Sequence, residues 1–168
     1  MTLALQTPAL FGLVMLPFTL AIGLWVAWSD LARMKIPNAA VLTLLALFLV
    51  VGPFLLPLAE WGWRWTHALV LLAAGYVLNQ IGALGAGDAK FVAAAAPFVA
   101  LEDAPLLLLP LSGLLLTGLV AHRIARRIPA LRALAPTWKS WTNPKFPAGF
   151  ALGPALPLYL AAVVVWGR

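Results

Sequence analysis

Long runs of apolar residues dominate this sequence, and charged side chains interrupt them at only a few places. The first run, residues 8–28, contains no charged residue, and about 20 apolar residues are enough for a helix to cross a bilayer. The chain has 64% hydrophobic residues, 10% charged residues and a mean hydropathy of +1.00, which is far from the composition of soluble domains. The sequence therefore predicts an all-α polytopic membrane protein.

Six helices of membrane-spanning length fit into 168 residues, and they leave no room for a separate soluble domain. We therefore predict a single transmembrane domain over residues 1–168. A polar hairpin loop is expected from Asp30 to Pro37, a Trp-rich interfacial loop from Glu60 to Trp65, and a basic interfacial loop over residues 122–146. The predicted spans lie near residues 8–28, 39–59, 66–84, 88–101, 104–121 and 147–166.

The fourth predicted span is short for a crossing and contains Pro97. Residues 89–101 would cover only about 20 Å as a helix, whereas the hydrocarbon core is about 30 Å thick, so a re-entrant segment is the alternative. Cytoplasmic loops carry an excess of Lys and Arg. If the segment crosses, one side of the membrane holds every Lys and Arg except Arg64 and Arg168. We therefore predict six spans, with the basic loops in the cytoplasm and both termini outside.

The five acidic residues divide between the two predicted sides. Asp30 and Asp88 fall on the cytoplasmic side, whereas Glu60, Glu102 and Asp103 fall outside. Ionisable residues within membrane segments are by default candidates for a functional site. Two neighbouring carboxylates do not both ionise easily, so one keeps a proton. Such a pair suits aspartyl hydrolysis, in which one group takes a proton from water and the other donates to the peptide carbonyl oxygen.

Asp88 follows two closely spaced glycines in the segment Gly85-Ala86-Gly87-Asp88. Glycine permits a positive φ or the close approach of another backbone, and the two glycines are expected to loosen the helix beside the acid. Lys90 is expected either to support the Asp88 carboxylate or the substrate, or to extend its ammonium group to the lipid headgroups.

The other acid, Asp30, precedes the sequence Ile36-Pro37-Asn38. Pro37 disfavours a helical conformation at Ile36, and Asn38 is a good N-cap for the second predicted span. This pattern predicts a tight reversal that returns the second helix alongside the first.

Together these segments resemble those of the type IV prepilin peptidases, which are membrane aspartyl proteases of the G-x-G-D type. The matching residues are Asp30 with Arg33, Lys35 and Ile36-Pro37-Asn38, then Gly85-Ala86-Gly87-Asp88 with Lys90, and more loosely Phe146-Pro147-Ala148-Gly149-Phe150-Ala151. The resemblance implies that Asp30 and Asp88 are the catalytic pair. The residues expected to support them are Gly85, Gly87, Lys90, Pro37 and Asn38.

The resemblance also implies a substrate and a location. A prepilin or pseudopilin would lose a short basic leader peptide at the cytoplasmic face of the bacterial inner membrane. Longer members of the family carry a cytoplasmic domain with paired cysteines and also methylate the new N-terminus. This sequence has no cysteine and no room for that domain, so it resembles the short branch associated with Flp or tight-adherence pili. Neither methyl transfer nor a cofactor is expected.

Two other functions share some of these features. Proton-coupled transporters also use paired membrane acids, but their sites lie near the bilayer midplane, often between inverted repeats, whereas Asp30 and Asp88 are predicted at one boundary. A signal-peptide-peptidase-like enzyme shares the G-x-G-D motif. Its other aspartate is expected within a helix and next to a tyrosine, whereas Asp30 is predicted to open a hairpin.

The basic charge of the chain and its two histidines suggest no further site. The net charge of +6 comes mostly from residues beside apolar runs, so membrane lipid, and not nucleic acid, is the expected partner. His67 and His122 have no ligand partner at a metal-binding spacing, and no metal site is predicted.

Overall fold

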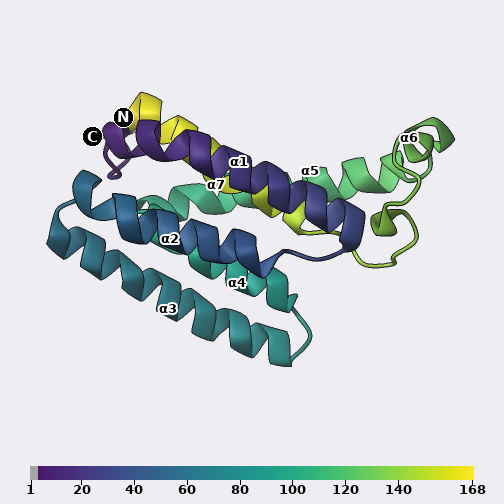
Figure 1. Ribbon diagram of the computed structural model, residues 1–168, viewed down its shortest axis with the longest axis horizontal. Coiled ribbons are helices and arrows are strands. Elements are labelled where there is room, and N and C mark those ends of the chain that lie inside the picture. Colours follow the sequence, from purple (N-terminus) through teal and green to yellow (C-terminus); the bar gives the residue numbers. More distant parts are fainter. Residues whose placement is uncertain (1–3) are drawn as a thin grey trace.

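A computed structural model describes residues 4–168, and helices account for the regular structure of this region. Figure 1 shows an elongated bundle whose long helices lie side by side, with a small lobe formed by α6 and its flanking loops at one end. The elements are α1 (Ala9–Arg33), α2 (Asn38–Leu55), α3 (Leu58–Gln80), α4 (Ala86–Ala95), the 3₁₀ turns η1 (Ala96–Phe98) and η2 (Leu101–Asp103), α5 (Ala104–Ala125), α6 (Pro129–Leu134), η3 (Lys139–Trp141) and α7 (Gly149–Trp166).

The two ends of the bundle are defined by contacts between distant parts of the sequence. At one end, called here the Thr7 end, the Thr7 N–H donates to Asp103. At the other, the Asp30 end, the Gly149 N–H donates to Asp30. The chain passes repeatedly between these ends along α1, α2, α3, the α4–η1 segment, α5 and α7 (Figure 1). Two residues that are separated by an even number of these segments therefore lie at the same end of the bundle.

Helices α1 and α7 form the most extensive helix pair, because glycines let their backbones approach closely. A Cβ added at Gly23 would overlap the carbonyl oxygen of Gly153, and one added at Gly153 would overlap that of Gly23. Nearer the Thr7 end, a Cβ at Gly12 would lie 2.8 Å from Cγ1 of Val163. Small residues at such contacts are typical of helix packing in membranes.

A cluster of aromatic rings joins this pair to the rest of the bundle. Phe11 of α1, Phe48 of α2 and Phe98 of η1 are fully buried, and their ring centroids lie 5.3–6.3 Å apart. Tilted and edge-to-face contacts at this separation are favourable. The cluster therefore fixes the α4–η1 segment against α1 and α2.

Four helical segments among residues 4–168 are long and apolar enough to cross a membrane. Their outer faces carry large apolar side chains: Phe54 is 84% exposed and Leu109 is 83% exposed. The all-α fold predicted from the sequence is therefore confirmed for the described residues, with four of the six predicted spans found as long apolar helical segments. The four segments are Ala9–Arg33, Asn38–Leu55, Leu101–Ala125 and Gly149–Trp166.

The predicted hairpin from Asp30 to Pro37 was too long. Helix α1 continues to Arg33, so Asp30 lies within its last turn. The helix ends because Met34 adopts a left-handed conformation with φ 56°, from which its N–H donates to the Asp30 carbonyl oxygen. Asn38 is also not the predicted N-cap: Pro37 holds that position, and Asn38 is the first residue of α2.

The Trp-rich segment from Glu60 to Trp65 was wrongly predicted as a loop. It forms the first turns of α3, which begins at Leu58 directly after Pro57. Proline is well suited to a helix start because its missing N–H would have no partner there. The Trp61 indole does not lie free at an interface, since its Nε1–H donates to the carbonyl oxygen of Phe48 at 3.2 Å.

The remaining predicted boundaries differ by a few residues. Helix α3 ends at Gln80, short of residue 84, because the chain turns at Gly82 with φ 74°. The fourth segment is a ten-residue α-helix followed by 3₁₀ turns, one of which contains Pro97. Helix α5 runs four residues past position 121, to Ala125. The predicted loop 122–146 therefore begins with the last turn of α5 and also contains α6 and η3.

Candidate active site

Asp30 is a buried carboxylate in the last turn of α1. Its side chain is only 6% exposed, and its Oδ2 accepts a 2.7 Å hydrogen bond from the N–H of Gly149. The following connection is tied back to the same turn, because the Ser29 hydroxyl donates to the carbonyl oxygen of Lys35 at 2.9 Å. Two chain segments therefore converge on this end of α1.

Asp88 lies in the first turn of α4 and is partly buried. Its carboxylate folds back against Gly85, where an added Cβ would overlap Oδ2 of Asp88. Gly85 has φ −67°, so this glycine does not serve a positive φ, and the atom that a Cβ would meet is the end of the Asp88 side chain. Asp88 lies at the same end of the bundle as Asp30, because the neighbouring Gly87 packs against Ile36 of the connection that follows α1. The structure thus brings together the two acids that the sequence predicted to lie on one side.

The second glycine of the motif and a glycine of α3 fix the position of α4. A Cβ at Gly87 would lie 3.3 Å from Cβ of Ile36, and a Cβ at Gly75 would lie 2.8 Å from Cβ of Ala89. The start of α4 is therefore packed between α3 and the connection that follows α1. The close approach predicted from the glycine spacing is found at Gly87, whereas the contact at Gly75 was not predicted.

The other predicted supporting residues lie near this site but are more exposed. Pro37 is partly buried at the N-cap of α2, whereas the side chains of Asn38 and Lys90 are exposed. Lys35, on the connection between α1 and α2, is exposed as well. The approach to the Asp30 end is therefore positively charged.

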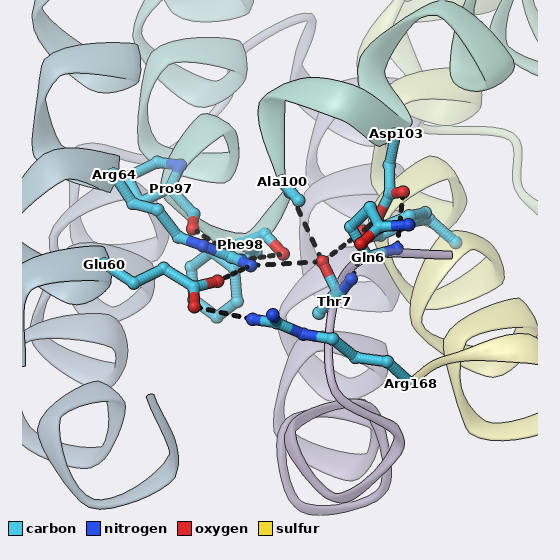
Figure 2. Close-up of polar contacts among 10 residues, drawn as sticks. Gln6, Thr7, Glu60, Arg64, Pro97, Phe98, Ala100, Asp103 and Arg168 are labelled. Carbon is cyan, nitrogen blue, oxygen red and sulfur yellow. Dashed lines mark hydrogen bonds and ion pairs between the residues drawn. The ribbon is translucent and has the colours of Figure 1, made fainter. Parts of the chain in front are cut away.

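A second polar cluster, at the Thr7 end, was not predicted from the sequence. Its centre is Arg64 of α3, which is 1% exposed. The guanidinium donates to the carbonyl oxygens of Pro97 and Phe98, to Thr7 Oγ1 and to Glu60 Oε1. Figure 2 shows these contacts converging from different parts of the chain. The interpretation of Arg64 as a loop residue outside the membrane overlooked this buried role.

The same cluster contains a buried carboxylate. Asp103 accepts hydrogen bonds from the N–H groups of Gln6 and Thr7, as Figure 2 shows, and from the Tyr159 hydroxyl. Glu60 completes the cluster by binding Arg168 at 2.6 Å. Asp103 and Glu60 are therefore at the opposite end from Asp30 and Asp88, as the sequence predicted.

The two histidines lie on α3 and α5. The His122 ring stacks on Trp141 with centroids 5.6 Å apart, and it joins α5 to η3. His67 lies on α3. Within residues 4–168, no three His, Cys, Asp or Glu side chains are grouped so that they could hold a metal ion.

Comparison with known proteins identifies the family. No curated protein and no solved structure gives a significant match. A model of the type IV leader peptidase family matches residues 14–121, which is more than half of the chain. The matched region includes both Asp30 and the Gly85–Asp88 segment. It therefore contains both acids of the site formed by Asp30 and Asp88, called here the paired-acid site. This membrane protein therefore belongs to the type IV leader peptidase family.

Proposed function

We propose that the protein is an aspartyl endopeptidase that removes the leader peptide of type IV prepilins or pseudopilins. Membership of the leader peptidase family supports peptide hydrolysis. The observation that carries the proposal is the meeting of Asp30 and Asp88 at one end of the bundle, where Gly87, next to Asp88, packs against Ile36 of the connection that follows α1. These two residues are the proposed catalytic pair.

The pair would work with one carboxylate ionised and the other protonated, because neighbouring carboxylates resist double ionisation. The ionised group accepts a proton from water while the water oxygen attacks the carbonyl carbon of the scissile peptide. The protonated group donates to the carbonyl oxygen, which gives a neutral tetrahedral intermediate. This intermediate collapses when the carboxyl group that took the proton from water gives it to the peptide nitrogen and the other, now ionised, carboxylate takes a proton from a hydroxyl group of the intermediate. The C–N bond breaks, which leaves a C-terminal carboxyl group on the leader and a new N-terminal amine on the pilin.

We propose that the chain crosses the membrane six times. The four apolar segments account for four crossings, and α3 and the α4–η1 segment are the other two. Two contacts support the added fourth crossing: Gly87 lies near Ile36 at the Asp30 end, and Ala100 donates its N–H to Thr7 Oγ1 at the Thr7 end. The Asp30 end is proposed to face the cytoplasm of a bacterial inner membrane, because the basic loops gather there. Residues 4 and 168 would then lie outside.

The substrate is proposed to present its short basic leader to this cytoplasmic end. We further propose the peptidase-only activity of the Flp or tight-adherence branch, without methyl transfer. The basic segment around α6 is proposed to lie on the lipid surface, because Leu134 is 81% exposed among several Arg and Lys side chains. An interfacial segment combines apolar contact with attraction to anionic lipid.

Co-expression with Flp-type prepilins tests the proposal. The wild-type chain should shorten a tagged prepilin by the mass of its leader, without adding the mass of a methyl group. Asp30→Asn and Asp88→Asn should each leave the prepilin uncut while the protein remains in the membrane. Glu102→Gln is the matched control, because Glu102 is exposed at the Thr7 end, and it should retain full activity.

The same variants separate the peptidase from the transporter alternative. Full cleavage by either aspartate variant would overturn the assignment of the catalytic pair. If the wild-type chain cuts no prepilin but moves protons across vesicle membranes in a manner that depends on Asp30 and Asp88, the transporter would replace the peptidase.

A further inference from the structure

The first residue of α7 binds Asp30 directly. The Gly149 N–H donates to Oδ2 of Asp30 at 2.7 Å, and both residues are buried. The first N–H groups of a helix have no acceptor within that helix, and the N-terminus carries a partial positive charge. The Gly149 N–H can therefore bind a carboxylate oxygen without breaking any hydrogen bond within α7.

The same position has no space for a side chain. A Cβ at residue 149 would lie 2.9 Å from Cβ and Oδ2 of Asp30 and 3.1 Å from its Cγ, separations at which something must shift. Helix α7 is not free to move away, because one turn later Gly153 lies directly against Gly23 of α1. The close packing of α1 and α7 thus sets where the Gly149 N–H meets Asp30.

We propose that Gly149 is a positioning residue, which orients the Asp30 carboxyl group within the catalytic pair. Because Oδ2 accepts the amide hydrogen, a proton carried by Asp30 resides on Oδ1. Oδ1 is then the oxygen that faces water or the substrate. The catalytic part of this inference rests on the proposed function, whereas the contact itself does not.

The kinetic test compares Gly149→Ala with Gly113→Ala. Gly113 lies on α5, and an added Cβ there meets nothing within 4 Å, so it controls for a methyl group added to a membrane helix. With a tagged prepilin that the wild-type enzyme cleaves, Gly149→Ala should lower kcat by about 10- to 100-fold per folded molecule, as for other small misplacements of catalytic groups. KM should stay near the wild-type value. If Gly149→Ala and Gly113→Ala have the same kcat, the proposal is wrong.

A second measurement keeps the proposal testable if Gly149→Ala does not fold. Amide hydrogen exchange at Gly149 is followed in the wild-type protein, in Asp30→Ala and in Asp88→Ala. Loss of the charged acceptor should speed exchange by about tenfold or more in Asp30→Ala, whereas Asp88→Ala should keep the wild-type rate. Unchanged exchange in Asp30→Ala would overturn the contact.

The two tests also separate this inference from the proposed function. If the exchange result holds but the wild-type chain cuts no prepilin, the contact stands and the proposed function fails. If Asp30→Asn is inactive but Gly149→Ala cleaves like its control, the positioning role fails and the catalytic pair stands.

Discussion

The hydroxyl group of Tyr159 donates a 2.7 Å hydrogen bond to Oδ2 of Asp103, at the opposite end of the bundle from Asp30. Asp103 also accepts the N–H groups of Gln6 and Thr7. One carboxylate therefore joins η2, α7 and the segment before α1. Such a group stabilises the fold without contacting the paired-acid site.

Asp103→Ala should strongly destabilise the protein, because it leaves donors from three residues without their acceptor, and two of them, Thr7 and Tyr159, are buried. We expect the free energy of unfolding to fall by about 3 kcal/mol or more, given about 1–3 kcal/mol for each unsatisfied group. Denaturant unfolding in detergent micelles measures this change. Glu102→Ala, at the exposed neighbouring position, should unfold like the wild type; equal stability of the two variants would contradict the prediction.

Tyr159→Phe should have a smaller effect than Asp103→Ala. The change removes the hydroxyl that contacts Thr7 at 2.6 Å and Asp103, but Asp103 keeps its two backbone donors. A loss of about 1–2 kcal/mol is expected, measured in the same unfolding experiment. Tyr76→Phe is the control, since Tyr76 is exposed on α3; a larger loss there than at Tyr159 would sink this prediction.

Gly153→Ala should disrupt the packing of α1 against α7. The new Cβ overlaps the carbonyl oxygen of Gly23, which is backbone and not a flexible side chain. Overpacking of this kind costs about 1–3 kcal/mol or more, and thermal unfolding should show it as a lower midpoint. Gly62→Ala introduces a Cβ that meets nothing within 4 Å and should be neutral or slightly stabilising. A Gly153→Ala protein as stable as Gly62→Ala would show that the two backbones are not in contact.

Reporter fusions test the proposed topology. Fusions after Lys35 and Lys139 should report the cytoplasm, whereas those after Leu56 and Asp103 should report the outside. Leu56 is chosen because it lies in the connection between α2 and α3, where a fusion leaves both helices whole. An external result at Lys139 would mean that the segment from α4 to η2 does not cross the membrane.

The pairing of Asp30 with Asp88 could be predicted from the sequence because it depends on the number of passes between them. The chain leaves the Asp30 end along α2 and returns along α3, so small errors in helix length do not change the side on which Asp88 emerges. The same counting placed Glu60 and Asp103 together at the other end.

Helix boundaries were harder to predict, because the residues concerned fit more than one environment. A single aspartate is compatible with either a loop or the last turn of a helix, and Asp30 occupies the latter. A predicted hairpin at Asp30 served as evidence against a signal-peptide-peptidase-like enzyme, in which this aspartate is expected within a helix. Because Asp30 lies within a helix, that evidence no longer applies. The tryptophans near Arg64 suited an interfacial loop, but the segment is helical and the Trp61 indole binds the carbonyl oxygen of Phe48.

The contacts that were missed join residues far apart in the sequence. Gly149 and Asp30 are separated by 119 positions, and Thr7 and Tyr159 by 152. No local pattern marks either pair. The segment around Gly149 loosely resembles the prepilin peptidases, and this resemblance was the one signal in the sequence. It did not indicate that Gly149 contacts Asp30.

Each member of the acidic pair belongs to a different pair of closely packed helices. Asp30 and its donor Gly149 belong to α1 and α7, whereas Asp88 belongs to α4, which meets α3 through Ala89 and Gly75. The distance between the two carboxylates therefore depends on how these two helix pairs pack against each other. The buried rings of Phe11, Phe48 and Phe98 hold α1, α2 and η1 together, so a change of bilayer thickness that tilted one pair against the other would have to strain this aromatic contact before it separated the acids.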